Sequence, residues 1–139
     1  MITFERKYRI LFRILFGVYV ATVLFLCFAR FDSAPDVPRS LFGIPTDKVV
    51  HFCMFFPFPF LAFLAFDSLT ETFWSSLFWA LGAFAAGAVL AGMTELVQAR
   101  TTYRSGDPMD FLADIIALGI ASIAVFTIDY AKQPKTKQL

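Results

Sequence analysis

The chain has 139 residues, 58% of them hydrophobic, and 19 are Phe. Soluble domains average about 45–50% apolar residues, so this excess argues against a water-soluble domain and predicts one integral membrane domain over residues 1–139. The formal net charge of +1 gives no sign of nucleic acid binding. Cys27 and Cys53 form no CxxC pair and no secreted disulfide pattern, so we expect buried free thiols.

Four apolar runs are each long enough to cross a ~30 Å hydrocarbon core as a helix. They cover about residues 10–29, 49–66, 73–93 and 111–128. In lipid these runs must be helical, because every backbone N–H and C=O needs an internal partner. The fold class we expect is all-α, a four-helix transmembrane bundle. Pro57 and Pro59 fall inside the second run, where prolines bend helices.

Basic residues lie before or at the start of the first span and after the last span, and they suggest an orientation. They are Arg6, Lys7, Arg9, Arg13, Lys132, Lys135 and Lys137. The positive-inside rule then makes both termini cytoplasmic, although the connection at residues 67–72 has no Lys or Arg. The first span has a basic start like a signal peptide, but its apolar stretch is long and no small-residue cleavage site follows, so we expect a retained anchor. We predict a multi-pass protein of the cytoplasmic (inner) membrane.

Polar and ionisable residues gather at the three span ends that this topology places outside. They are Asp47, Lys48, His51, Glu95, Gln98, Arg104, Asp107, Asp110 and Asp114. A charge at the centre of a membrane helix costs roughly 2.5–3.5 kcal/mol on insertion scales, so such residues are rare without a role. The sequence therefore predicts a polar cluster at the extracytoplasmic helix ends.

Asp47 and His51 are four residues apart and share a helix face. One interpretation is a carboxylate that orients an imidazole, which makes His51, Asp47 and Glu95 the catalytic candidates. The other is a plain helix cap at Thr46 or Asp47 with an interfacial histidine. A single histidine excludes a multi-histidine metal site but not a carboxylate-rich one. The spacing matches no metal motif, so we expect no metal and no cofactor.

Glu95 continues a stripe of small residues at four-residue intervals, through Ala91, Gly87 and Ala83. Small residues let helices approach closely, so Glu95 should face the bundle interior and need a partner. The candidate partners are Arg104, Lys48 and His51. The alternative role of such a pair is only to lock the bundle. Gln98 is a weaker candidate for a cap or an interhelical hydrogen bond.

The sequence Asp107-Pro108 is typical of a helix start, with Asp as the cap and Pro at the first helical position. Asp110 and Asp114 follow on one face, and Asp114 should be the deeper acid. Two like charges one turn apart repel unless a cation, a proton or an arginine offsets them.

These motifs together resemble the VanZ-like family of small bacterial membrane proteins. The matching segments are Asp47-Lys48-Val49-Val50-His51-Phe52, Glu95-Leu96-Val97-Gln98 and Arg104-Ser105-Gly106-Asp107-Pro108-Met109-Asp110. The family pattern has Asn where Asp114 stands and Gly where Ala117 stands, which puts in doubt any role needing a neutral amide there. The resemblance covers about residues 47–121, and it implies four helices and a link to glycopeptide (teicoplanin) resistance, with no settled activity.

Three functions remain open at this point. The leading hypothesis is an envelope protein that binds an amphiphilic ligand or an envelope lipid, with its headgroup at Lys48, His51, Glu95, Gln98, Arg104, Asp107, Asp110 and Asp114. The second is an intramembrane enzyme acting on a lipid-linked substrate, with His51 as acid or base. The third is a structural bundle whose polar network fixes helix register. No GxSxG or HExxH signature is present.

Overall fold

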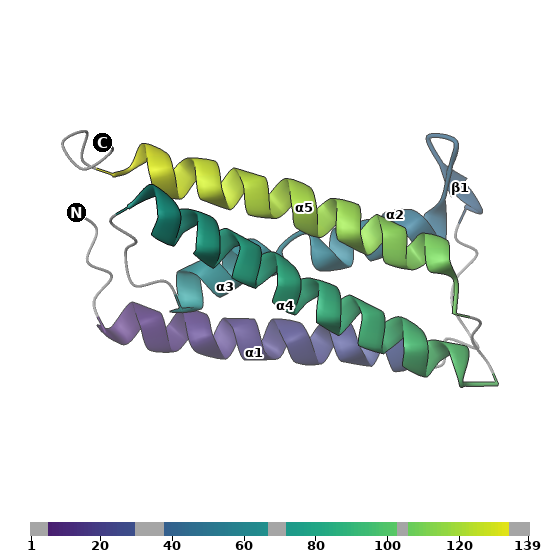
Figure 1. Cartoon of the computed structure of the whole chain (residues 1–139). Coiled ribbons are helices and arrows are strands. Elements are labelled where there is room, and N and C mark those ends of the chain that lie inside the picture. Colours follow the sequence, from purple (N-terminus) through teal and green to yellow (C-terminus); the bar gives the residue numbers. More distant parts are fainter. Residues whose placement is uncertain (1–5, 30–37, 67–71, 103–105, 134–139) are drawn as a thin grey trace.

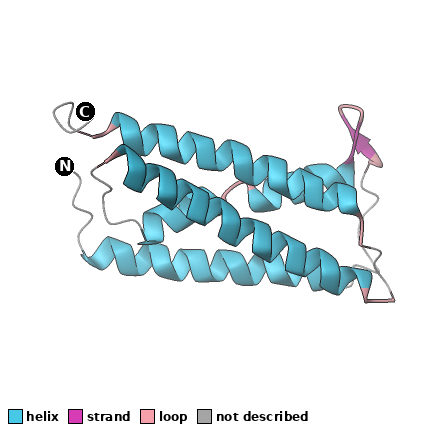
Figure 2. Cartoon of the chain, in the orientation of Figure 1, coloured by secondary structure: helices cyan, strands magenta, loops and turns pink. Residues whose placement is uncertain are grey.

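The computed structural model describes residues 6–29, 38–66, 72–102 and 106–133, and over them the chain is almost entirely helical (Figures 1 and 2). The elements in order are α1 (Arg6–Phe28), β1 (Ser40–Leu41), β2 (Ile44–Pro45), α2 (Thr46–Phe55), α3 (Phe58–Phe66), α4 (Phe73–Ala99) and α5 (Pro108–Ala131). Four stretches are long and apolar enough to cross a membrane: α1 from Tyr8, α2 with α3, α4, and α5. The predicted all-α class and the four candidate spans are confirmed.

Successive candidate spans run in opposite directions, so the bundle has two distinct ends (Figure 1). One end brings together the end of α1, the start of α2, the end of α4 and the start of α5, and we call it the site end. Within the bundle, α4 packs chiefly against α5, α2 against α5, and α3 against α1. The second and third candidate spans therefore both contact α5.

The second span is broken near its middle, as Pro57 and Pro59 predict. Phe56 and Pro57 separate α2 from α3, and Pro59 lies in the first turn of α3. Proline lacks a backbone N–H and cannot continue the hydrogen-bond ladder. The Tyr19 hydroxyl of α1 donates to the carbonyl of Met54, so one acceptor near the break is used by another helix.

Close packing of α4 against α5 rests on small side chains. Ala83, Gly87 and Ala91 are all buried, which confirms the predicted inward stripe. A Cβ added at Gly87 would lie 2.5 Å from Cδ2 of Leu118, a residue that is fully buried on α5. Gly87 is thus required by the proximity of the two helices, in line with small-residue packing in membranes.

A short hairpin precedes α2 and was not predicted. β1 and β2 pair antiparallel, and Phe42 and Gly43 form the turn with φ of 53° and 80°. Both central residues of such a turn need positive φ, which favours glycine and strains Phe42. The predicted cap at Thr46 or Asp47 is wrong, because Pro45 precedes the helix and no side chain caps it. The Thr46 hydroxyl instead donates to the carbonyl of Pro38.

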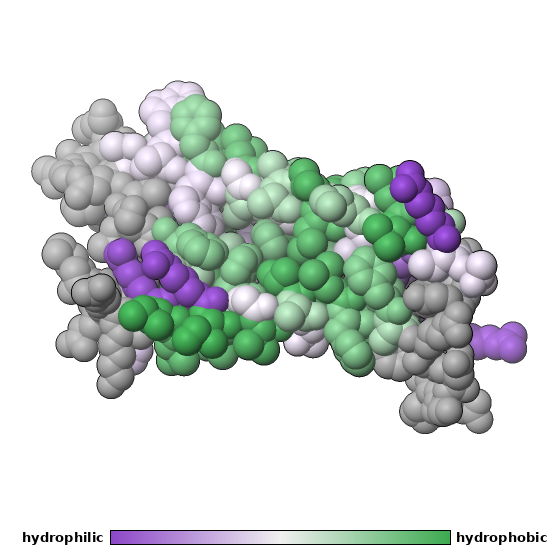
Figure 3. Space-filling view, turned by 90° about the horizontal axis from the view of Figure 1, so that it is seen from below, coloured by the Kyte–Doolittle hydropathy of each residue, from purple (hydrophilic) through white to green (hydrophobic). Residues whose placement is uncertain are grey.

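The surface between the two ends is apolar. Figure 3 shows apolar side chains over the middle of one face, with the strongly hydrophilic residues toward its two ends. The long helices expose many large aliphatic residues, including Ile14, Val18 and Ile123. This distribution suits an environment of hydrocarbon with polar layers on both sides. Neither cysteine forms a disulfide, but only Cys27 is buried. Cys53 is exposed, so the expectation of a buried thiol is wrong for Cys53.

Candidate functional site

A lysine and three carboxylates form the first polar group at the site end. The Lys48 ammonium on α2 lies 2.7 Å from Asp107, 2.9 Å from Asp110 and 3.1 Å from Asp47. The Lys48 side chain is 19% exposed, so its stem is covered while its charge meets all three acids. We call these four residues the Lys48 group. They join the start of α2 to the start of α5.

A histidine and three carboxylates form the second group, which lies deeper in the bundle than the first. His51 Nδ1 lies 3.1 Å from an oxygen of Asp114 and 3.8 Å from Oε1 of Glu95. His51 Nε2 lies 3.7 Å from Asp110. We call these four residues the His51 group. Asp114 is fully buried, as expected for the deeper acid, and the group joins α2, α4 and α5.

The partner of His51 differs from the expected one. The sequence suggested Asp47, one turn away on the same helix. The structure places Asp114 of α5 against the ring instead, while Asp47 is exposed and contacts Lys48. Spacing within one helix could not show this, because the contact joins residues 63 positions apart.

Glu95 is divided between two roles. Its Oε2 accepts a hydrogen bond from the backbone N–H of Asp107 at 3.2 Å. Its Oε1 is buried and accepts no hydrogen bond, and it faces the His51 ring. Glu95 is only 9% exposed, so an oxygen without a donor is unusual at this depth.

The start of α5 is fixed by local sequence. Asp107 caps the helix by accepting from the N–H of Met109 at 2.9 Å, and Pro108 occupies the first turn, as predicted. Gly106, which sequence reasoning passed over, lies so near the end of α4 that an added Cβ would be 2.7 Å from the Cβ of Ala99. A glycine is needed there for the chain to reach the Glu95 carboxylate.

The neighbours of Asp107 lower the pKa of its carboxyl group. The hydrogen bond from the Lys48 ammonium, assisted by the N–H of Met109, holds the pKa of the Asp107 carboxyl below its usual range. The cap is therefore ionised at neutral pH, which also suits its place at a helix N-terminus.

One predicted site residue, Gln98, lies apart from these groups. Gln98 donates from Nε2 to the backbone carbonyl of Cys27 at 2.7 Å, so it ties α4 to α1. Arg104 lies outside the described residues. The remaining predicted positions, seven in number, all belong to the Lys48 group or the His51 group.

Two sets of acidic and imidazole groups have ligand atoms within 4.8 Å of one another: His51 with Glu95 and Asp114, and Asp47 with Asp107 and Asp110. The second set already surrounds the Lys48 ammonium. The first set has only the imidazole as a source of positive charge among the residues that the structure describes. It is therefore the set with the chemistry to bind a cation.

A pocket of about 350 Å³ opens beside the His51 group, between α4 and α5. Glu95 and Asp107 lie on its wall, and most of the remaining lining is apolar, including Gly92, Leu96 and Phe111. The pocket thus has polar residues at one place and a hydrocarbon-like wall elsewhere. An amphiphile needs both.

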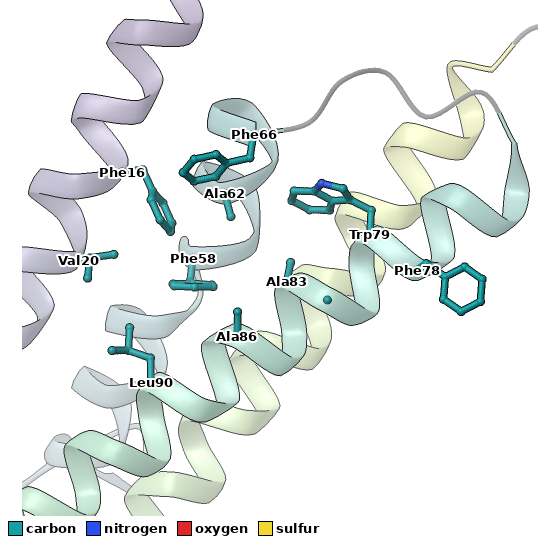
Figure 4. A pocket seen from close by; sticks show the side chains of 11 residues that line it. Phe16, Val20, Phe58, Ala62, Phe66, Phe78, Trp79, Ala83, Ala86 and Leu90 are labelled. Carbon is teal, nitrogen blue, oxygen red and sulfur yellow. The ribbon is translucent and has the colours of Figure 1, made fainter.

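A larger pocket of about 630 Å³ lies among α1, α3 and α4 (Figure 4). Phe16, Phe58, Phe66 and Trp79 line it with alanines and aliphatic side chains, and none of its lining residues is ionisable. In Figure 4, Phe78 points away from the other lining side chains. This pocket offers apolar space but no group for acid–base or metal chemistry.

The opposite end of the bundle has a polar network of its own. The Ser76 hydroxyl donates to Asp129 at 2.5 Å, and Gln133 Nε2 donates to the Ser76 hydroxyl at 2.6 Å and to the Thr72 carbonyl at 3.2 Å. The network links α4 to the end of α5. It contains no histidine, lysine or arginine among the described contacts.

Comparisons with known proteins give no relative for this chain: no family model, no curated protein and no solved structure matches it.

Proposed function

We propose that this chain is a four-span membrane protein that binds an amphiphile at the site end. The headgroup would meet Glu95 and Asp107, and the apolar tail would lie along the pocket between α4 and α5. The observation that carries the proposal is that one pocket joins these two carboxylates to a wall containing Gly92, Leu96 and Phe111. The motif resemblance to VanZ-like proteins agrees with an envelope role, and that membership is itself part of the proposal.

Charge favours a particular class of headgroup. The Lys48 and His51 groups together contain one lysine against five carboxylates, a formal charge of −4 with neutral His51. An anionic headgroup would be repelled by these acids, while an amine would be attracted. The ligand class is therefore an amphiphile with a cationic amine, such as an amine-bearing envelope lipid.

The test uses a fluorescent long-chain alkylamine titrated into the purified chain in detergent. Gly92→Leu fills the pocket, and a Cβ at this position makes only ordinary contact, 3.6 Å from Phe111. Gly17→Leu on α1 is the matched control, because nothing lies within 4 Å of its Cβ. We expect Gly92→Leu to weaken probe binding and Gly17→Leu to leave it unchanged. Equal binding by both variants would refute the pocket.

The orientation is part of the same proposal. The basic residues near the two ends of the sequence support cytoplasmic termini, which makes the site end extracytoplasmic. In a background without the native cysteines, Phe42→Cys at the hairpin tip should react with an impermeant maleimide in intact cells. Lys132→Cys should react only after permeabilisation. The reverse pattern would place the site end inside the cell.

A second candidate rests on the buried pair of His51 and Asp114. A carboxylate 3.1 Å from an imidazole in a dry setting is an arrangement that supports acid–base chemistry. The substrate would be a lipid-linked molecule entering from the same pocket. An enzyme predicts that His51→Ala abolishes a chemical change in the lipid pool, detected by mass spectrometry, while the variant still inserts. Binding alone predicts no such change in the wild type.

The resemblance adds one cellular expectation. Expression of the chain in a susceptible host should raise tolerance to teicoplanin, and an unchanged response would remove the resistance link.

A further inference from the structure

Three ligand-type side chains converge inside the His51 group. Nδ1 of His51, a carboxylate oxygen of Asp114 and Oε1 of Glu95 lie within 4.8 Å of one another, and the two contacts made by the nitrogen are 3.1 and 3.8 Å. All three residues are buried, and they come from α2, α5 and α4. Three helices therefore present three ligand atoms to one point.

These separations match the edges of a small coordination shell. Ligands about 2.1 Å from a four-coordinate zinc ion lie about 3.4 Å from one another at tetrahedral angles. The distances from His51 Nδ1 to Asp114 and to Glu95 Oε1, 3.1 and 3.8 Å, lie on either side of that value. Calcium binds at about 2.3–2.6 Å and needs six to eight oxygens, so it suits these three ligands poorly.

An independent observation points to a missing positive partner. Oε1 of Glu95 is buried, accepts no hydrogen bond and is directed at the imidazole. A buried carboxylate oxygen normally has a donor or a cation beside it. The neighbouring acid set shows what such a partner looks like, because the Lys48 ammonium lies among Asp47, Asp107 and Asp110.

Charge balance favours a divalent ion over a proton on the histidine. A protonated His51 offsets one charge and leaves one of the two carboxylates uncompensated at low dielectric. A divalent ion with neutral His51, Glu95 and Asp114 sums to zero. His51 Nε2 lies 3.7 Å from Asp110, so the ring nitrogen that does not bind the ion faces a carboxylate, as is usual for metal-bound histidines.

We propose that His51 Nδ1, Glu95 Oε1 and an Asp114 carboxylate oxygen form a buried site for a divalent transition metal of the zinc class. One nitrogen and two carboxylate oxygens also suit Mn²⁺ and Fe²⁺, whereas Mg²⁺ and Ca²⁺ bind imidazole poorly. The ion joins α2, α4 and α5 in the way that Lys48 joins α2 and α5 closer to the surface. The amphiphile site shares Glu95, but the metal proposal does not depend on it, because the two charges of the ion still leave the Lys48 and His51 groups with a formal charge of −2.

The test measures metal alone. The full chain is purified in phosphatidylcholine nanodiscs, stripped with a chelator, dialysed against Zn²⁺ and measured by atomic spectroscopy beside empty nanodiscs. We expect one zinc per chain, a rise in Tm on adding zinc, and no displacement by Ca²⁺ or Mg²⁺. Co²⁺ in the same site should give the visible d–d absorption of low coordination number.

Two nearly isosteric variants and one control decide the assignment. Glu95→Gln and Asp114→Asn should each weaken zinc binding by about tenfold or more. Asp47→Asn removes the same charge from the same end of the bundle, but the exposed Asp47 is no ligand of the proposed site, so its zinc binding should equal that of the wild type.

Any of three results overturns the proposal. The first is a zinc content in wild-type nanodiscs no higher than that in empty nanodiscs. This result does not depend on whether any variant folds. Another is an Asp47→Asn loss as large as that of Glu95→Gln, which would indicate nonspecific attraction to acids. The third is displacement of zinc by Ca²⁺ at equal concentration. None of these results bears on binding of the alkylamine probe.

Discussion

Replacing Lys48 by Met tests whether the Lys48 group stabilises the bundle. Met keeps an unbranched apolar stem and removes the ammonium from its three acids. Of the three acids, Asp110 should lose the most stabilisation, because its side chain is only 12% exposed and its carboxylate lies 2.9 Å from the Lys48 ammonium. Losing a hydrogen bond to a charged, largely buried group lowers the free energy of unfolding by about 1.5–3 kcal/mol. Asp47 is 56% exposed, and an exposed pair contributes about 0–1 kcal/mol.

The sum of these effects is a decrease of about 1.5–4 kcal/mol in the free energy of unfolding for Lys48→Met. The assay is reversible unfolding in mixed micelles with increasing SDS, in the presence of a chelator so that no metal replaces the ammonium. Asp47→Asn is the control, and it should lower the unfolding free energy by less than about 1 kcal/mol. A Lys48→Met variant within about 0.5 kcal/mol of wild type would show that the acids do not need the ammonium.

Two further predictions concern packing and pH. Gly87→Ala should lower the free energy of unfolding by about 1–3 kcal/mol, because the new methyl group overpacks against Leu118. Gly82→Ala is the control and should be neutral or mildly stabilising, because nothing lies within 4 Å of its new Cβ. Equal Tm values for the two variants would refute the close contact at Gly87. Because Lys48 depresses the folded-state pKa of Asp107, the contribution of this carboxylate to stability is complete above the ordinary aspartate pKa. It is lost as the pH falls through the depressed value, so wild type and Asp107→Asn should converge in stability on acidification, as measured by denaturation at a series of pH values. A constant difference across the acid range would contradict the pairing.

The sequence was most informative where one helix alone decides the outcome. Hydrophobic run length gave the four candidate spans, and four-residue spacing gave the inward faces of Glu95 and Asp114. The Asp107 cap followed from two adjacent residues. All of these depend on geometry within a single helix.

The sequence was least informative about which helices meet. The contact of His51 with Asp114 and that of Gln98 with the Cys27 carbonyl join distant parts of the chain. Helical spacing says which residues share a face, but it does not say which face of another helix lies opposite. The hairpin was missed because a Phe occupies a turn position that favours glycine.

The break at Pro57 divides the second candidate span into two short helices. At 1.5 Å per residue, α2 and α3 measure roughly 15 and 14 Å, so neither half crosses a ~30 Å core alone. The halves have different neighbours, since α2 packs chiefly against α5 and α3 chiefly against α1. Because α5 also contacts α3, this one helix spans the break and links the two halves of the second candidate span.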